Sequence, residues 1–438
     1  MTSRFFFPTV FLILFVCAVC CQATAKIYID IDEPGFRQFP IAVCDFQNTH
    51  GLTTSGDTVN TKIAEDVRFY LSLTGLFELL DKSSFLEGVE PGLPEVIRFT
   101  DWSLIGADFL LRGDVARESG RLTAEIRLYD IARGRVILQK KYKEATGDTR
   151  ETARAIASDI LLTITGDEGD FSTKIALVVK NKGAGDIFSI NYDATELAPI
   201  TTHKSIIITP RWSPDGRFLA FTSYKNGRPV VYLRNLHTGK EKEVAAFPGL
   251  NMCGSFSPDS KKLLLTLSKD GNEEIYSLNV ETMKLTRLTN NYAIDVSPAW
   301  SPDGEKIVFV SNRSGTPQIF IMDAGGQNVN RVTFKGNYNT SPSWSPRGDR
   351  IAYEGLIDRK YQIFTVDTEG NNPTQLTFDE ADNEYPSWSP SGRQIVYSSR
   401  RGSKTRICIM NANGQNMRIL LGYQNGLAMP SWSPRMSR

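Results

Sequence analysis

A large aromatic side chain recurs in this sequence at an unbroken interval of 44 residues. The six positions are Trp212, Phe256, Trp300, Trp344, Trp388 and Trp432. A repeat of about 40 to 45 residues is typical of the β-propeller blade, a small antiparallel sheet that needs neighbours to bury both of its faces. The interval therefore predicts a ring of six sheets.

Apolar residues at constant distances behind each aromatic residue predict the strands of one unit. In the third unit, Ile307 and Phe309 stand seven and nine residues after Trp300, and Ile319 and Phe320 follow at nineteen and twenty. The other units carry branched or aromatic side chains at the same distances, and these residue types favour strands. A last strand is expected at Val244, Leu288, Val332, Leu376 and Leu420.

A proline-centred turn follows the aromatic residue, as in 213–216, where the sequence reads Ser-Pro-Asp-Gly. Proline presets φ near −65°, and glycine accepts the positive φ that such a hairpin turn needs. The turn explains Asp215, Asp259 and Asp303, which could otherwise be read as glycosidase carboxylates. We therefore interpret the repeated phrase as architecture and not as a catalytic motif.

The two ends of the repeat complete each other. Ile175, Leu177 and Ile187 stand at strand positions of a first unit, but Glu168 occupies the place where its aromatic residue should be. Trp432, at the other end, opens a unit that has no later strands. We expect the C-terminal strand to pair into the blade that begins near Ile175, because a closed ring leaves no free sheet edge.

The sequence before residue 165 follows a different pattern. A helix is expected over 148–166, with Asp148 and Glu151 as a capping box and Gly166 as its end. Another helix is expected over 61–75, and three strands over 108–143 with turns at 118–121 and 132–135. The predicted fold is a small α/β domain over 26–165 and an all-β six-bladed propeller over 171–438, closed by the C-terminal strand, with the joint at 166–170.

Residues 1–25 have the pattern of a secretory signal peptide. Arg4 precedes an apolar run, and Ala23 and Ala25 form an A-x-A exit. An uncleaved anchor is the alternative, although Pro8 interrupts the run. Cleavage would leave 49 basic and 49 acidic residues, so no net charge draws the mature chain to nucleic acid or to a membrane. We expect a secreted protein without direct membrane insertion.

The sequence offers little for catalysis, a cofactor or a metal site. A peptidase with a propeller cover would need a Gly-x-Ser-x-Gly elbow, which is absent. The histidines are His50, His203 and His237, without metal-ligand spacing, and we expect surface or packing roles for them. Three cysteines follow the leader, Cys44, Cys253 and Cys408, and we expect buried thiols. The sequence therefore favours a binding protein without cofactor or metal.

The loops before the aromatic strands are the expected binding surface, because they open at one mouth of the propeller channel. Their residues are apolar or weakly polar, which suits a protein partner, although they could equally serve to pack the loops. These positions are Ile208, Met252, Cys253, Val296, Asn339, Thr340, Asn383, Glu384 and Ala428.

Three segments, taken together in this order, resemble the TolB family, the periplasmic component of the Tol-Pal system. They are DWSLIGADFLLRG at 101–113, STKIALVV at 172–179, and the repeats of the WSPDG type. The resemblance implies a periplasmic, monomeric, non-enzymatic adaptor that binds the lipoprotein Pal through the propeller and communicates with TolA through its mature N-terminus. It also implies a contribution to envelope integrity and to outer-membrane constriction at cell division. The alternative is a propeller enzyme or a sugar-binding protein that acts on cell-wall fragments.

Two sets of contact residues follow from that resemblance and from the mouth positions. The Pal-contacting loop falls on 247–260 with Leu250 and Cys253, and on Val296 in the next unit; Leu250 stands where relatives carry histidine. The first set is Leu250, Met252, Cys253, Val296, Thr340, Glu384 and Ala428. The second set, in a segment that could also be an edge strand of its own domain, is Lys26, Ile27, Tyr28, Ile29 and Asp30.

Overall fold

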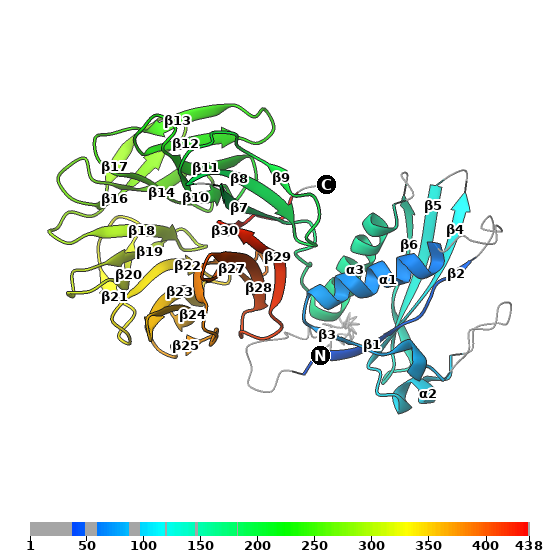
Figure 1. The fold of residues 1–438 in the computed structure, drawn as a ribbon. Helices are drawn as coiled ribbons and strands as arrows, with labels where there is room; N and C mark the ends of the chain where they lie inside the picture. Colours follow the sequence, from blue (N-terminus) through cyan, green and yellow to red (C-terminus); the bar gives the residue numbers. More distant parts are fainter. Residues whose placement is uncertain are drawn as a thin grey trace, which may run out of the picture.

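The computed structural model describes residues 37–48, 59–86, 97–118, 121–144, 148–181 and 183–436. The expected leader at 1–25 and the expected N-terminal contact residues Lys26 to Asp30 lie outside these residues. The described chain forms a small domain and a ring of sheets that lie side by side (Figure 1). None of the helices in these ranges is long and apolar enough to cross a membrane.

The N-terminal domain is a mixed sheet with two long helices across one face. Its sheet has the order β3-β1-β4-β5-β6, with β2 pairing β4; β1 runs parallel to β3 and β4, and β4 to β6 form the predicted antiparallel meander. The elements are β1 Phe39–Val43, β2 Gln47–Asn48, α1 Val59–Leu73, β3 Phe77–Leu79, a 3-10 turn Lys82–Ser84, α2 Phe99–Leu104, β4 Phe109–Glu118, β5 Arg121–Asp130, β6 Arg135–Glu144 and α3 Thr149–Thr165.

The last helix of this domain begins and ends where its sequence predicts. The Asp148 side chain accepts a hydrogen bond from the Arg150 backbone N–H at 2.9 Å, which satisfies one of the free donors of the first turn. Gly166 ends the helix with φ at 73°, a conformation that other residues adopt only with strain. The face between Ala153 and Ile164 is buried against α1.

The propeller consists of six four-stranded sheets around an axis (Figure 1). In five of them the strands follow the order of the chain from the channel outward, because each hairpin joins sequence neighbours. These five sheets contain β10 Ile207–Trp212, β11 Phe218–Ser223, β12 Val230–Asn235, β13 Glu241–Ala245; β14 Asn251–Phe256, β15 Lys262–Leu267, β16 Glu274–Asn279, β17 Leu285–Arg287; β18 Asp295–Trp300, β19 Lys306–Ser311, β20 Gln318–Asp323, β21 Asn330–Arg331; β22 Asn339–Trp344, β23 Arg350–Ile357, β24 Lys360–Asp367, β25 Thr374–Gln375; β26 Asp382–Trp388, β27 Gln394–Arg401, β28 Lys404–Asn411, β29 Arg418–Asn425.

The sixth sheet confirms the predicted closure. Its order is β30-β7-β8-β9, where β30 is Leu427–Trp432 and the others are Lys174–Asn181, Ala184–Asn191 and Ala198–Pro199. Trp432 stands opposite Ile175 in an antiparallel pair, and its indole N–H donates to Thr173 Oγ1 at 2.8 Å. The end of the chain therefore supplies the innermost strand of the blade that residue 174 begins.

The turns behave as predicted, whereas the outermost strands end early. Gly216 and Gly304 adopt φ of 70° and 75° in the proline-centred turns, and even Ser260 adopts 60°. The predicted last strands at Leu288, Val332 and Leu376 are wrong in their extent, because β17, β21 and β25 stop one residue before these positions. Val332 and Leu376 are nevertheless buried. The backbone N–H groups of Leu288, Val332 and Leu376 still donate to the carbonyls of Ile275, Ile319 and Ile363 in the third strand of their blades, each at 2.8 Å.

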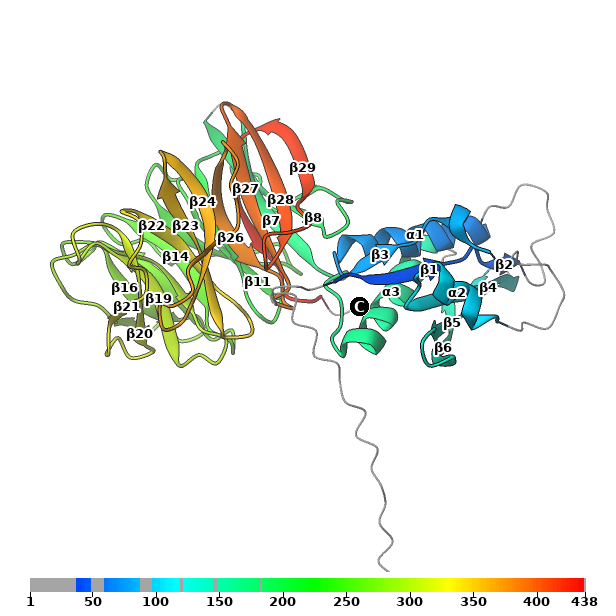
Figure 2. The same cartoon turned by 90° about the horizontal axis from the view of Figure 1, so that it is seen from below.

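The N-terminal domain is attached to the rim of two blades and does not cover the channel (Figures 1 and 2). The Tyr192 hydroxyl lies 2.8 Å from both the Leu73 carbonyl of α1 and Gln394 Oε1 of β27. The Arg418 guanidinium stacks 4.6 Å above the ring of Tyr192. These contacts belong to one apolar cluster that extends from α1 and α3 into the blades of β7 and β27.

Candidate functional site

Six of the nine predicted mouth residues occupy one register position in the six innermost strands. Each pairs with the second strand of its own blade, as Val296 does with Val310 and Thr340 with Glu354. All are half-buried and surround the same end of the channel. The set comprises Ile208, Met252, Val296, Thr340, Glu384 and Ala428. The structure therefore brings together residues that lie 44 positions apart in the sequence.

A β-bulge follows this position in the innermost strands. The register shifts between Val296 and Ala299, for example, and the intervening Ser297 has φ at 53° in front of Pro298. Left-handed backbone is uncommon outside glycine, and a following proline disfavours the α region further. Five innermost strands nonetheless adopt it, at Thr209, Ser297, Ser341, Tyr385 and Met429. The bulge re-aims the strand start toward the mouth.

The innermost strand of the second blade lacks the left-handed residue and the proline, and its Cys253 is buried. The strand carries Cys253 and Gly254 in place of a left-handed residue and proline. A Cβ on Gly254 would lie 2.7 Å from the Pro298 carbonyl oxygen, so only glycine fits there. Cys253 is 4% exposed, and burial raises the pKa of its thiol to about 12. The Cys253 thiol lies beneath the mouth surface.

Leu250 stands on the mouth, at the tip of a well-held loop. Its backbone N–H donates to Ser268 Oγ at 2.7 Å, and the Asn251 side chain bonds to both the N–H and the carbonyl of Phe247. Leu250 is half-buried and belongs to none of the apolar clusters of the propeller. We name the seven residues Leu250, Met252, Cys253, Val296, Thr340, Glu384 and Ala428 the strand-start rim.

Sequence reasoning missed a crescent of exposed apolar side chains beside this rim. They stand in the loops that precede or begin the innermost strands of four blades, and three of them are more than half exposed: Tyr292 at 89%, Phe378 at 77% and Phe334 at 66%. The exposed apolar crescent comprises Ile206, Tyr292, Ile294, Phe334, Tyr338 and Phe378. The 44-residue register could have revealed part of it, because Ile206, Leu250, Ile294 and Tyr338 share one repeat position.

A buried carboxyl group lies in the channel wall next to the rim. Glu354 Oε1 accepts from Ser341 Oγ at 2.9 Å, and its Oε2 accepts from the Tyr385 backbone N–H at 2.8 Å. Burial raises the pKa of Glu354 to about 7, and these two hydrogen bonds oppose the increase only in part. The sequence analysis did not identify Glu354. The equivalent positions of the other blades carry Thr, Val or Ser, so Glu354 is the charged residue at this position of the repeat.

The acidic side of the rim continues onto the fifth blade. Arg400 Nη2 lies 3.1 Å from Asp382 Oδ2, and Arg400 Nε lies 3.7 Å from Glu384 Oε2. Burial raises the pKa of Glu384, whereas Arg400 lowers it. A cavity of about 360 Å³ opens here between the fifth and sixth blades, with Glu384 and Ala428 in its wall. The rim is thus apolar on one side and carries buried acidic groups on the other.

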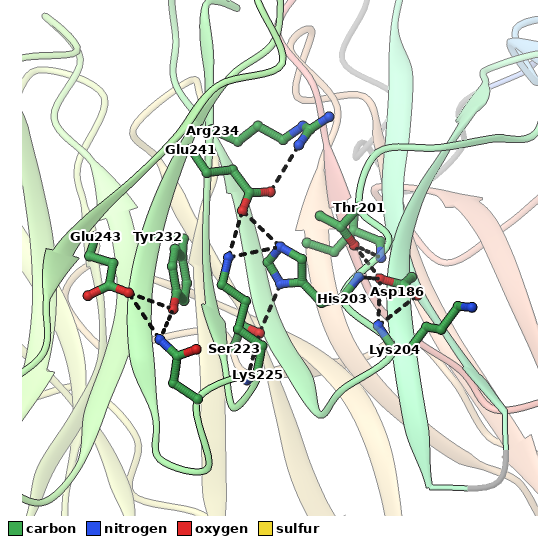
Figure 3. Close-up of polar contacts among 12 residues, drawn as sticks. Asp186, Thr201, His203, Lys204, Ser223, Lys225, Tyr232, Arg234, Glu241 and Glu243 are labelled. Atoms are coloured by element: carbon green, nitrogen blue, oxygen red, sulfur yellow. Dashed lines mark hydrogen bonds and ion pairs between the residues drawn. The ribbon is translucent and has the colours of Figure 1, made fainter.

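A charged cluster joins the first and sixth blades on the same face of the ring (Figure 3). Glu241 accepts from His203 Nε2 at 2.8 Å, from Lys225 Nζ at 2.9 Å and from Arg234 Nη1 at 2.9 Å. Burial alone would raise the pKa of Glu241, but the hydrogen bonds from His203 and Lys225 outweigh it and lower the pKa to about 2. His203 has the packing role expected from the sequence.

Other reactive groups are also engaged in structure. Cys44, Cys253 and Cys408 are free and buried, as predicted. Within the described ranges, the His, Cys, Asp and Glu side chains form no group of three or more that could hold a metal ion. Asp215 and Asp303 accept hydrogen bonds from Ser213 and Ser301 inside their turns.

Two family models match the chain. The model described as TolB beta propeller domain matches residues 162–436, and the model described as TolB amino-terminal domain matches residues 27–137. Among curated proteins, the Tol-Pal system protein TolB of Syntrophus aciditrophicus is 42% identical over 228 residues, which cover 51% of this chain and 50% of the relative. The protein of that name from Desulfosudis oleivorans is 37% identical over 252 residues, covering 56% of this chain and 57% of the relative.

These sequence matches span about half the length of each relative. A solved structure covers more. The crystal structure of TolB from Acinetobacter baumannii is 29% identical, covers 91% of this chain and 97% of its own, and superimposes with a TM-score of 0.79. The order of the two domains is therefore the same in both proteins.

Proposed function

The chain belongs to the TolB family, and from this premise we propose that it is a periplasmic adaptor of the Tol-Pal system that binds Pal at the strand-start rim. The curated relatives carry the name of that system. In this proposal the protein contributes to envelope integrity and to outer-membrane constriction at division, and it performs no catalysis. The mature N-terminal segment, Lys26 to Asp30, would contact TolA.

The exposed apolar crescent carries this proposal. Monomeric soluble proteins rarely expose several large apolar side chains in one patch, and such patches mark protein interfaces. Tyr292, Phe334 and Phe378 are exposed in the loops that lead into three of the innermost strands, whose starts carry half-buried Val296, Thr340 and Glu384. Aromatic residues and methionine are enriched at interface centres because they bury much area at low entropic cost. A protein partner would cover this surface.

The acidic side of the rim would give the interface its orientation. Glu384 is held by Arg400, and Glu354 lies in the wall beside it. A basic or hydrogen-bond-donating loop of Pal would meet these groups, whereas an acidic loop would be repelled. The family resemblance implies a histidine at the position of Leu250, and because this chain has leucine there we propose that its contact with Pal is apolar. Cys253 would support the rim from below.

A calorimetric titration tests the proposal. The mature protein is titrated with the soluble domain of Pal, and we expect saturable binding that is lost in a variant carrying both Val296→Arg and Glu384→Arg. The control carries Val136→Arg and Glu369→Arg, which make the same changes at exposed positions away from the rim. Absence of binding by the wild type, or equal binding by the rim variant, would remove the rim from the proposal.

A further inference from the structure

The opposite end of the channel holds a cavity of about 380 Å³. All six blades contribute to its wall through the ends of their innermost strands, and four of them also through the proline of the following turn. The lining includes four tryptophans, Phe256 and six prolines, together with serine side chains. None of the lining residues is an aspartate or a glutamate, and all of them are described by the structure. We name it the tryptophan-end cavity.

One lining residue breaks the sixfold pattern. The residue before the repeated aromatic is small in five units, namely Ser255, Ala299, Ser343, Ser387 and Ser431, but it is Arg211 in the first. Five small side chains leave room for one long one. Arg211 is therefore the only cation among the residues that line this cavity.

Arg211 has no acidic partner among the described residues. Its Nη1 donates to the carbonyl of Pro210, the preceding residue, at 3.1 Å, and this leaves most of its five N–H donors unused. Burial lowers the pKa of the Arg211 guanidinium, and no carboxylate opposes that effect. Arginine nevertheless stays protonated at neutral pH. A half-buried positive charge is thus held in the wall of the cavity without a carboxylate partner, and an anion bound there would pair with it.

We propose that the tryptophan-end cavity binds a small organic carboxylate. The carboxylate pairs with the Arg211 guanidinium, and the apolar body of the ligand lies against the indole and proline rings. This site goes beyond the proposed function, because it lies at the other end of the channel from the strand-start rim.

The chemistry of the wall favours this ligand class over other anions. A guanidinium binds a carboxylate through two parallel hydrogen bonds, which are strong where water is excluded. A phosphate dianion would need a second cation, and the lining residues offer none. Pockets of about 300 to 1,000 Å³ with apolar walls and few polar groups are typical of small-molecule sites. The volume of the cavity suits a single-ring carboxylate.

The test compares phenylacetate with phenylacetamide, which has the same shape and no charge. Each is titrated into the full-length mature protein, followed by tryptophan fluorescence and by calorimetry. We expect phenylacetate to bind at least tenfold more tightly than phenylacetamide and than inorganic phosphate. Equal affinity for the amide, tighter binding of phosphate, or no binding of phenylacetate at millimolar concentrations would overturn the proposal.

Variants locate the site. Arg211→Met is expected to weaken phenylacetate binding at least tenfold, whereas Arg228→Met, the same change at an exposed position of the same blade, leaves it unchanged. Ser343→Leu fills the cavity without altering Arg211 and should abolish binding, so the test does not depend on one variant folding. Unchanged binding in both Arg211→Met and Ser343→Leu would contradict the assignment.

Discussion

The two ends of the propeller channel are built from the same six strands but carry different kinds of side chain. At the turn end, aromatic, proline and serine residues repeat nearly unchanged, because they connect one blade to the next: the Trp388 indole N–H donates to the Ser343 carbonyl of the preceding blade. At the start end, the equivalent residues range from Met252 to Glu384 and face the mouth. The repeat is strict where blades contact each other and relaxed where a partner could bind.

Two residues depart from the repeat by carrying a charge. Arg211 and Glu354 are both charged residues at register positions that are otherwise small or weakly polar. Neither forms an ion pair with another described side chain. A propeller can tolerate such groups because five other blades supply the stability of the ring. Departures from the repeat are therefore the positions where chain-specific chemistry is expected.

The largest effect is expected from a substitution at the turn end. Trp432→Ala removes a buried ring that packs on the closing strand and deletes its hydrogen bond to Thr173. The free energy of unfolding should fall by about 3 to 5 kcal/mol, measured by urea denaturation at pH 7. Leu104→Ala is the control. Leu104 is 78% exposed, so this substitution should change the free energy of unfolding by less than about 0.5 kcal/mol. A loss below about 1 kcal/mol for Trp432→Ala would mean that ring closure is not stabilising.

A smaller effect, dependent on pH, is expected in the channel wall. The pKa of Glu354 is about 7 in the folded protein, above its value of 4.5 in an unfolded chain. The folded state therefore holds the proton more tightly, so the stabilising contribution is complete below pH 4.5 and is lost as the pH rises through 7. Because of this group, the free energy of unfolding of the wild type should fall by about 3 kcal/mol between pH 4.5 and 8. In Glu354→Gln this fall should be absent. Parallel stability curves for the variant and the wild type would contradict this assignment.

The opposite pH dependence is expected for Glu241, on the outer part of the same face. Its pKa is lowered to about 2, so its contribution is present above pH 4.5 and is lost as the pH falls toward 2. Glu241 is partly exposed and solvent screens its ion pairs. Glu241→Gln should thus cost about 1 to 2 kcal/mol at pH 7 and much less at pH 2.5, as thermal unfolding at both values can show. An equal cost at both values would assign the effect to packing.

The smallest effect on stability is expected from Tyr292→Ala in the exposed apolar crescent. Tyr292 is 89% exposed, so the free energy of unfolding should change by less than about 0.5 kcal/mol. The affinity for Pal should nevertheless fall about tenfold or more if Tyr292 is buried by the partner. Chemical denaturation and calorimetry on the same samples separate the two effects. Unchanged affinity would exclude Tyr292 from the interface.

Much of the fold could be predicted from the sequence, because one blade is a local structure. The 44-residue interval, the proline turns and the missing strand of the first unit were sufficient to predict six blades and their closure. The outermost strands end one residue before Leu288 and Val332, although the N–H groups of both residues still donate to the neighbouring strand. Apolar character alone does not separate a strand residue from a packed residue beyond its end.

The sites were harder to predict because they depend on residues that meet only across the ring. The mouth positions follow from the repeat, but the burial of Cys253 depends on Gly254 and its contact with Pro298 in the next blade. The unpaired state of Arg211 and the pairing of Glu354 with Tyr385 involve neighbouring blades in the same way. No local pattern records whether a charged residue has a partner in space.

Hydrogen exchange of the mature protein, with and without the soluble domain of Pal, compares the two mouths in one measurement. The account predicts that Pal slows exchange in peptides that cover 248–253, 292–297 and 382–385, and leaves the turns at 213–216 and 301–304 unchanged. Slower exchange at those turns, with no change at the strand starts, would place the partner at the wrong end of the channel and contradict the account.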